Sequence, residues 1–274
     1  MNRFRARLGL PLRNDRPATR PDHVPDVIEV ILEERVPVFS IGLGNPAREL
    51  VDRCHAQGTK VIAMVATAED ARAVAARGVD VIVAQGSEAG GHRSTWRKSP
   101  SAQHAAIGTM SLVPEVVRAV NMPVVAAGGI TSGRGVVAAL ALGAQGAMIG
   151  TRFIATPEAR ARDFYKQALI EGRSDDTVIT DAYTGLYARL LRNTYIDSYD
   201  ASSAPTLPGY LQLNVNNDII AKALNDEDRN FYPLWAGQGV GMIKDLRPAA
   251  EVLHEVVREA EAALSVLNSL LVER

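Results

Sequence analysis

The sequence predicts an α/β fold built around a parallel sheet. Five short apolar segments alternate with helical segments between residues 36 and 149. These segments are rich in valine, isoleucine and alanine, and the run 81–84 is typical of a strand buried on both faces. Glycine-rich turns follow several of them. Because alternation of strand and helix indicates βαβ units, we expect a parallel sheet, either closed as a barrel or doubly wound.

The expected elements follow one another closely. A first helix is expected from residue 24 or 25 to residue 34, with its apolar residues on one face. Glycines that end helices stand at Gly58, Gly78 and Gly143. The expected strands are 36–41, 60–66, 79–84, 123–127 and 144–149, and the helices between and after them are 47–57, 69–77, 111–120 and 132–142.

The remaining segments lack this alternation. Residues 1–22 contain Pro11, Pro17 and Pro21 among scattered arginines and are predicted to form an extended connector. Residues 157–230 are polar with helix-like patterning and are predicted to form a small helical subdomain, while 23–156 and 231–274 form the main domain. A last helix, 248–271, is expected to pack on the main domain through Leu253, Val256, Val257, Ala260, Leu264, Leu267 and Leu271.

Composition is that of an ordinary soluble globular protein. The 274 residues include 30 Lys and Arg against 31 Asp and Glu, so the net charge of -1 gives no attraction to nucleic acid or to an anionic membrane. No apolar run approaches the roughly 20 residues that span a bilayer. The basic residues 1–20 lack the apolar core of a secretory signal, and an arginine-rich transit peptide is the alternative to the connector. The single cysteine, Cys54, is interpreted as a packed residue and suits a reducing cytoplasm.

One predicted strand runs into a glycine-rich loop that carries a histidine. The apolar residues 81–84 are followed by Gln85 and then by Gly90, Gly91 and His92. Glycine permits backbone conformations closed to other residues and lets a ligand approach the main chain. An imidazole with a pKa near 6.5 exchanges protons readily at neutral pH, so His92 is a candidate general base. The alternative is a hydrogen-bonded histidine without a catalytic role, and no metal-ligand spacing occurs among the histidines.

Two further glycine turns follow consecutive predicted strands. The first contains Gly128 and Gly129, the second contains Gly150 and Thr151, and each precedes a helix. Main-chain N–H groups at such turns bind phosphate without a lysine, and barrels often place this site after their last two strands. The alternative is a pair of ordinary turns between strand and helix. The glycine spacing differs from the dinucleotide-binding fingerprint.

Two segments show no repeating pattern. The long loop 86–110 is expected to be a functional lid or a mobile segment. A group of tyrosines is interpreted as helical packing rather than as a platform for stacked bases, because no basic stripe accompanies it. These tyrosines are Tyr183, Tyr187, Tyr195 and Tyr199.

Four motifs follow one another along the chain. They are Gln85-Gly86-Ser87-Glu88-Ala89-Gly90-Gly91-His92-Arg93, Ala126-Ala127-Gly128-Gly129-Ile130, Met148-Ile149-Gly150-Thr151-Arg152-Phe153 and Leu234-Trp235-Ala236-Gly237-Gln238. Taken together and in this order, they resemble the successive signatures of the nitronate monooxygenases, also known as 2-nitropropane dioxygenases. The resemblance covers most of residues 23–274 and is more specific than any single turn.

The resemblance implies a TIM barrel of the (β/α)8 type that binds FMN. His92 corresponds to the catalytic histidine of the family, which removes the proton from the carbon that bears the nitro group. The glycines at 128, 129 and 150 would hold the FMN phosphate together with Thr151. The full set of cofactor-binding residues would be Gln85, Gly90, Gly91, Gly128, Gly129, Met148, Ile149, Gly150, Thr151 and Gln238.

The implied reaction is the oxidative denitrification of alkyl nitronates or nitroalkanes by O2, which yields a carbonyl compound and nitrite. FMN carries the redox chemistry, while the protein supplies positioning and one base. The expected partners are therefore small molecules, the nitronate or nitroalkane and O2, in a cytoplasmic flavoprotein oxidoreductase. Neither nucleic acid nor a membrane nor a metal is expected.

The family's barrel has eight strands, whereas the sequence predicts five. The resemblance implies that the first three strands precede the segment beginning near Arg3, so we expect an incomplete barrel of five parallel strands. Related FMN barrels reduce enoyl-acyl-carrier substrates or quinones with NAD(P)H, and this activity is one alternative. The alternative of another class is a non-catalytic truncated fragment, or a half that needs a partner chain. The protein partner would be a second copy in a homo-oligomer or the missing N-terminal half.

Overall fold

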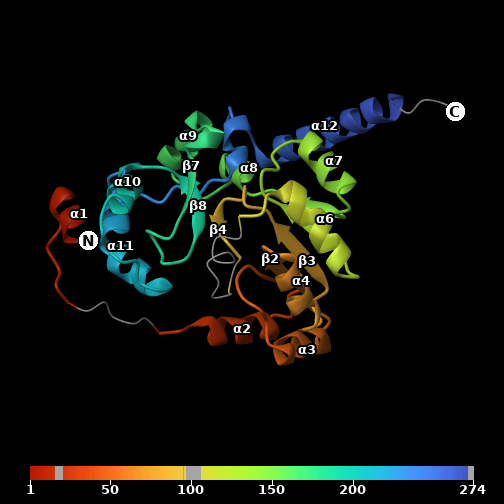
Figure 1. Ribbon diagram of the computed structural model, residues 1–274, viewed down its shortest axis with the longest axis horizontal. Coiled ribbons are helices and arrows are strands. Elements are labelled where there is room, and N and C mark those ends of the chain that lie inside the picture. Colours follow the sequence, from red (N-terminus) through yellow and green to blue (C-terminus); the bar gives the residue numbers. More distant parts are fainter. Residues whose placement is uncertain (16–20, 95, 97–105, 271–274) are drawn as a thin grey trace.

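The fold is organised around one parallel sheet (Figure 1). The computed structural model describes residues 1–15, 21–94, 96 and 106–270. In these residues the sheet has the strand order β1-β2-β3-β5-β6, so each strand lies beside its neighbour in the chain. A doubly wound sheet reverses at a switch point, whereas this order winds one way only, as in a barrel. The strands are β1 (Val38–Ile41), β2 (Lys60–Val65), β3 (Val81–Gln85), β5 (Val124–Ala127) and β6 (Gly146–Met148).

Helices cover one face of this sheet, as the alternation predicts. In Figure 1 they lie together on one side of β2 and β3. Two of them begin at side-chain caps, because the Thr67 hydroxyl accepts from the Asp70 N–H and the Ser132 hydroxyl from the Gly135 N–H. The helices are α2 (Val24–Glu33), α3 (Arg48–Ala56), α4 (Ala68–Ala75), α6 (Thr109–Ala119) and α7 (Gly133–Ala141).

The main core lies between the sheet and these helices. Alternate residues of β2 are buried against the helices, whereas Ile62 and Met64 point to the other face and are half-buried. The central strand β3 is buried along most of its length. At the edges, Val38 on β1 is 48% exposed and Met148 on β6 is 38% exposed. The prediction that 81–84 forms a strand buried on both faces is confirmed, whereas the edge strands β1 and β6, each with a single strand neighbour in the described sheet, are more exposed.

A second sheet of three antiparallel strands joins the glycine loop to the segment after residue 176. Its order is β4-β8-β7, with β4 (Gly91–His92), β7 (Thr177–Thr180) and β8 (Ala188–Leu191). The prediction of a purely helical segment over 157–230 is wrong at β7 and β8. These strands have four residues each, and β8 is buried at every position, so no alternation of polar and apolar residues marks them.

Around this second sheet lies a separate core of aromatic side chains. Tyr183, Tyr195 and Tyr199 are buried, and the rings of Tyr183 and Tyr195 are stacked with centroids 4.3 Å apart. The interpretation of these three tyrosines as packing residues is confirmed. The subdomain boundaries stay a prediction. The helices of this region are α8 (Thr151–Ile154), α9 (Asp163–Glu171), α10 (Thr194–Asp200) and α11 (Tyr210–Asn225), with a 3-10 turn at η1 (Ser174–Asp176).

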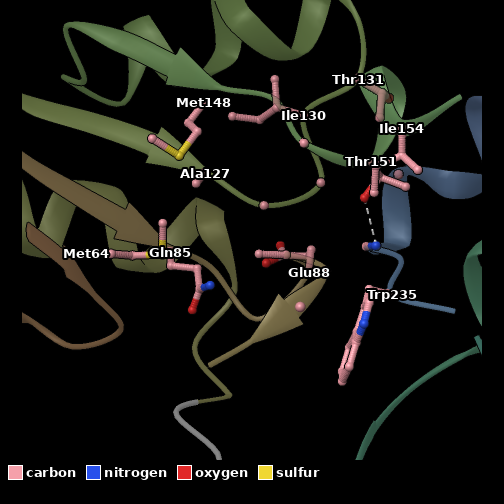
Figure 2. Close-up of a pocket in the computed structure, with 18 residues that line it drawn as sticks. Met64, Gln85, Glu88, Ala127, Ile130, Thr131, Met148, Thr151, Ile154 and Trp235 are labelled. Carbon is pink, nitrogen blue, oxygen red and sulfur yellow. Dashed lines mark hydrogen bonds between the residues drawn. The ribbon is translucent and has the colours of Figure 1, made fainter. Parts of the chain in front are cut away.

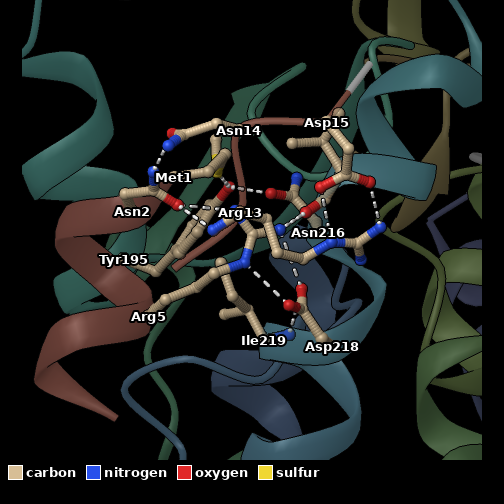
Figure 3. Close-up of polar contacts among 11 residues, drawn as sticks. Met1, Asn2, Arg5, Arg13, Asn14, Asp15, Tyr195, Asn216, Asp218 and Ile219 are labelled. Carbon is tan, nitrogen blue, oxygen red and sulfur yellow. Dashed lines mark hydrogen bonds and ion pairs between the residues drawn. The ribbon is translucent and has the colours of Figure 1, made fainter. Parts of the chain in front are cut away.

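The N-terminal segment is partly helical, which corrects the prediction of an extended connector over residues 1–22. Helix α1 (Asn2–Arg7) precedes the prolines and packs on the aromatic core, with the Phe4 and Tyr195 ring centroids 4.6 Å apart. The buried Arg5 guanidinium donates to the Asp218 carboxylate at 2.7 Å (Figure 3). These contacts, which lie 190 or more residues away in sequence, hold a helix that local pattern did not reveal.

The C-terminal helix packs only through its first half. Helix α12 (Ala249–Ser269) follows η2 (Gln238–Met242) and crosses α7, where a Cβ at Gly133 would lie 2.2 Å from the Val256 carbonyl oxygen. Val252 and Val256 are buried, and Gly133 permits the close approach. The prediction of one fully packed face is wrong, because α12 is much longer than α7 and extends beyond it (Figure 1). The exposed members of that face are Leu253, Val257, Leu264 and Leu267, and Leu271 lies outside the described residues.

Within the described residues, no helix combines the length and the apolar character that crossing a membrane requires. Cys54 is buried in the main core, as expected for a packing residue. Residues 97–105 of the predicted long loop lie outside the described part of the chain.

Candidate active site

A cavity of about 230 Å³ opens at the carboxyl ends of β3, β5 and β6 (Figure 2). In parallel α/β folds this edge is where ligands bind. The lining comes from all four sequence motifs and from the end of β2, and it is mostly main chain and apolar side chains. Its members are Met64, Gln85, Glu88, Ala89, Gly90, Gly91, Ala127, Gly128, Gly129, Ile130, Thr131, Met148, Gly150, Thr151, Ile154, Trp235, Gly237 and Gly239.

The turn after β5 requires glycine. Gly128 has φ +110° and Gly129 has φ +70°, conformations that side chains with a Cβ rarely adopt. A Cβ at Gly128 would also lie 3.0 Å from the Ala89 nitrogen. Within the described residues, the main-chain N–H groups of Gly128 and Gly129 donate no hydrogen bond. Both N–H groups are therefore free to donate to a ligand in the cavity.

The turn after β6 is tied to the fourth motif. Gly150 precedes α8, and the hydroxyl of Thr151, the first residue of α8, accepts a hydrogen bond from the Gly237 N–H at 3.0 Å (Figure 2). Gly237 in turn lies against the first loop, because a Cβ at Gly90 would be 2.5 Å from the Gly237 nitrogen. The main-chain N–H of Gln238 donates to the Glu88 carbonyl at 2.9 Å. Motifs that are 150 residues apart in sequence thus form one wall.

Glu88 and Thr109 fix the near side of the cavity. The Glu88 carboxylate accepts from the Thr109 N–H at 2.9 and 3.0 Å and lies 2.9 Å from the Thr109 hydroxyl. Thr109 is the first residue of α6, so Glu88 satisfies an N–H group that the helix leaves unpaired. The carboxylate also suits the positive end of the helix dipole.

Two buried guanidinium groups donate hydrogen bonds to main-chain carbonyls of the first loop. Arg93 donates to the carbonyls of Gly86 and Gln85, both at 2.8 Å, and Arg189 donates to the Ser87 carbonyl at 2.7 Å. Burial and the charge of Arg189 lower the pKa of Arg93 to about 10, while Glu88 acts in the opposite direction. Arg93 therefore stays protonated at neutral pH and keeps both of its loop carbonyls bound.

The Gln85 side chain ties β3 to the histidine strand. Its Nε2 donates to the His92 carbonyl at 2.8 Å, and its Oε1 accepts from the Ser94 N–H at 2.9 Å. The Ser94 hydroxyl continues the chain by donating to the Met64 carbonyl at 2.6 Å. Gln85 lines the cavity, but both ends of its amide are bound to the main chain on either side of Arg93.

The His92 imidazole lies beside the cavity rather than in its lining. Its Nε2 is 2.9 Å from the Thr184 Oγ1, and its ring centroid is 5.1 Å from that of Trp235, which does line the cavity. Burial lowers the pKa of His92, because the charged form loses its hydration. The ring is therefore neutral at neutral pH and able to accept a proton.

The structure brings most of the predicted site residues together. Those that line the cavity are Gln85, Gly90, Gly91, Gly128, Gly129, Met148, Gly150 and Thr151. Ile149 instead packs against the main core, and Gln238 contributes its main chain to the wall. The prediction missed Met64, Glu88, Trp235 and Gly237. Three of these stand inside the recognised motifs, whereas Met64 is marked only by its place near the end of a strand.

Comparison with known proteins identifies the family. The sequence model of the nitronate monooxygenases matches residues 18–259, which is most of the chain. The chain belongs to the nitronate monooxygenase family. A protein of Staphylococcus saprophyticus described as "Probable nitronate monooxygenase" is 35% identical over 250 residues, covering 90% of this chain and 69% of the relative. The chain spans 65–69% of the length of the first curated relatives it matches.

Solved structures agree with the family assignment. Nitroalkane oxidase from Streptomyces ansochromogenes is 36% identical, with a TM-score of 0.88 over 96% of this chain and 75% of that one. FabK from Thermotoga maritima is 31% identical, with a TM-score of 0.77 over 92% and 76%. This nitronate monooxygenase family member thus has the predicted α/β fold of TIM-barrel type, and its described residues form an open sheet of five parallel strands.

Proposed function

We propose that this chain binds FMN in the cavity and oxidises alkyl nitronates or nitroalkanes with O2 to a carbonyl compound and nitrite. The observation that carries the proposal is the joining of glycine turns and a neutral histidine at one sheet edge. The cavity includes Gly128, Gly129 and Gly150, and His92 contacts its lining residue Trp235. The family assignment and the likeness to a nitroalkane oxidase support the reaction.

The residues present fit FMN. Within the described part of the chain, the N–H groups of Gly128 and Gly129 and the hydroxyl proton of Thr151 have no acceptor, so these groups would hold the phosphate. Gly90 and Gly91 would let the ring system approach the main chain, with Met64 and Met148 as apolar contacts. Bound FMN would supply the redox chemistry of the reaction.

His92 would act as the base. The carbon beside a nitro group is acidic because the nitro oxygens take up the charge, and a neutral imidazole can accept its proton. A neutral nitroalkane needs this step, whereas a preformed nitronate has already lost the proton. The proposed role of His92 therefore applies to the neutral substrate.

Flavin binding is tested first, with the visible spectrum of the purified protein before and after addition of FMN. We expect the flavin absorbance near roughly 450 nm to stay with the protein through gel filtration. A protein that remains colourless and aggregates with FMN present would contradict the proposal and support the non-catalytic alternative.

The role of His92 is tested by His92→Ala. We expect retained flavin colour and a loss of about 10²–10⁴-fold in turnover of a neutral nitroalkane, the usual contribution of a general base. Turnover of a preformed nitronate should fall much less. Oxygen uptake and nitrite release measure both rates. His254→Ala, on α12, is the matched control and should leave both rates unchanged.

The likeness to FabK favours a second candidate, NAD(P)H-dependent reduction of an enoyl-acyl-carrier or quinone substrate. Anaerobic addition of NAD(P)H distinguishes the two: rapid bleaching of the flavin would support the reductase, whereas oxygen uptake with a nitronate alone supports the oxidase. We also propose a cytoplasmic location for this protein, on the strength of its single cysteine, which cell fractionation would test.

A further inference from the structure

The orientation of the His92 ring depends on few contacts. Its Nε2 lies 2.9 Å from the Thr184 Oγ1, and this is the one hydrogen bond of the ring within the described residues. Trp235 contacts one face of the ring. The main chain of His92 is fixed separately, by Gln85 and by pairing with Ala188. Thr184 is therefore the residue able to choose which ring nitrogen carries the proton.

The hydrogen bonds of the Thr184 hydroxyl decide this choice. Its oxygen lies 3.2 Å from the Leu186 carbonyl oxygen and accepts from the Leu186 N–H at 3.3 Å. A hydroxyl has one proton to donate. If that proton goes to the Leu186 carbonyl, the His92 Nε2 must donate its own proton to the hydroxyl oxygen, and Nδ1 keeps the free lone pair. If it goes to Nε2, the lone pair at Nε2 is occupied and the Leu186 carbonyl loses this partner.

Only the first arrangement suits a base that must accept a proton. Protonation at Nδ1 leaves the bond from Nε2–H to Thr184 in place, and the positive charge strengthens it. In the second arrangement, protonation at Nε2 would place a new N–H against the hydroxyl proton and require the hydroxyl to rotate. Hydrogen-bond balance and base chemistry thus agree on Nε2–H as the resting form.

Thr184 is itself held in place by buried groups. Thr184 is only 4% exposed. The two residues before it, Ala182 and Tyr183, have carbonyls that each accept from the Asn216 Nδ2 at 3.0 Å. The Tyr195 hydroxyl oxygen also lies 3.2 Å from the Ala182 carbonyl oxygen. Such a rigid turn can orient a partner side chain without rearranging.

The charged groups near the ring are engaged elsewhere. Arg93 and Arg189 donate to loop carbonyls, and Glu88 caps α6 through Thr109. Tyr187, which precedes the partner strand β8, accepts at its carbonyl from the Arg93 N–H at 2.8 Å. None of these charged groups contributes to the pKa of His92, which burial lowers. An uncharged hydroxyl is the remaining means of fixing the ring.

We propose that Thr184 is a positioning residue for His92. Its oxygen accepts the Nε2 proton, which fixes the imidazole in the Nε2–H form, holds the ring beside Trp235 and leaves Nδ1 as the nitrogen that takes the substrate proton. The inference rests on the proposed role of His92 as a base. The interaction between Thr184 and His92 is a hydrogen bond, so it transfers no electrons and needs no further reactant.

The test compares Thr184→Val, which keeps the shape and removes the hydroxyl, with Thr184→Ser, which keeps the hydroxyl. Nitrogen NMR of histidine-labelled protein reads the protonation of each ring nitrogen directly, and His92→Gln identifies the signal among the five histidines. We expect the Nε2–H form in the unmodified protein and in Thr184→Ser. In Thr184→Val we expect a mixture of forms and a titration moved to lower pH, because the charged ring loses its acceptor. Thr194→Val, whose hydroxyl bonds Asn230 at the surface, is the matched control.

Turnover provides the second measurement. Thr184→Val should lower neutral nitroalkane turnover at least about tenfold, the effect of one hydrogen bond to a charged group, with little change in KM. Thr184→Ser should restore most of it, and circular dichroism should show all variants folded. An Nδ1–H ring in the unmodified protein, or an unaltered His92 signal in folded Thr184→Val, would overturn the inference. If instead His92→Ala retains neutral nitroalkane turnover, the base role fails while the NMR result on Thr184 still stands by itself.

Discussion

The two sides of the candidate site are held together by different forces. The glycine turns proposed to bind phosphate follow the parallel strands, whose core is apolar, with side chains such as Leu112 and Ile82 fully buried. The Thr184 side rests on a core where buried amides and hydroxyls bind main-chain carbonyls, with Asn216 and Gln212 at its centre. Apolar burial is tolerant of small shifts, whereas a buried polar network is stable only when every group is paired. The proposed cofactor turns and the proposed base therefore depend on separate cores and should fail under different conditions.

The largest difference between the two cores should follow from removing one buried amide. Asn216→Ala deletes two donated bonds and one accepted from the Tyr195 hydroxyl, and should lower the free energy of unfolding by about 3 kcal/mol. Because its partners precede Thr184, turnover per folded molecule should fall as well. Leu112→Ala in the main core should cost about as much stability, roughly 2–5 kcal/mol, without changing that turnover. Urea unfolding and nitrite release measure the two effects.

Asn225→Ala, at an exposed position of the same helix, is the control and should change neither quantity. If Asn216→Ala loses less than 1 kcal/mol, or if Leu112→Ala lowers turnover equally, the two cores are not separate in the way we describe.

High pH should weaken the polar core in particular. Burial raises the pKa of Tyr183 and Tyr195 above the ordinary 10.0, so both stay protonated in the folded protein. Their stabilising contribution is fully present below pH 10 and is lost at higher pH, where the unfolded chain releases those protons. Above pH 10, each of these tyrosines should lower the free energy of unfolding by about 1.4 kcal/mol per pH unit. Tyrosinate absorbance should rise together with unfolding.

Tyr210→Phe removes an exposed tyrosine and should leave that transition in place. Titration of all seven tyrosines near pH 10 in a protein that stays folded would argue against a buried polar core.

Low pH should destabilise the region of the parallel sheet, and the loss of stability should be smaller than the loss at high pH. Burial alone would raise the pKa of Asp80, but hydrogen bonds from Lys60, the Val61 N–H and His55 lower it to about 2. Its contribution is fully present above pH 3.8 and is lost as the pH falls toward 2. Asp80→Asn should therefore cost roughly 1–2 kcal/mol at pH 7 and nothing near pH 2. Thermal unfolding across this range measures the difference.

Asp52→Asn breaks an exposed pair with Arg48 and should cost no more than about 0.5 kcal/mol. An equal loss in both variants would mean that the bonds around Asp80 add nothing beyond an ordinary surface charge.

Sequence alone predicted the parallel region well and the polar region poorly. Strands β2 and β3 and the stops at Gly58 and Gly78 follow local patterns that period and residue type reveal. Glycine turns such as Gly128-Gly129 can be recognised in the sequence because a positive φ favours glycine. Helix α1, the pairing of β8 with β4 and the bond from His92 to Thr184 depend on partners about ninety or more residues away, so no short window of sequence contains them.

The two-residue strand β4 has a consequence for how this fold changes over time. His92 pairs with β8 on one side and is anchored by Gln85 of β3 on the other, so it stands at a joint between the two cores. Substitutions around Thr184 can retune proton affinity while the turns at 128–129 and 150 stay untouched. The proposed cofactor site and the proposed base can therefore be altered independently by substitution.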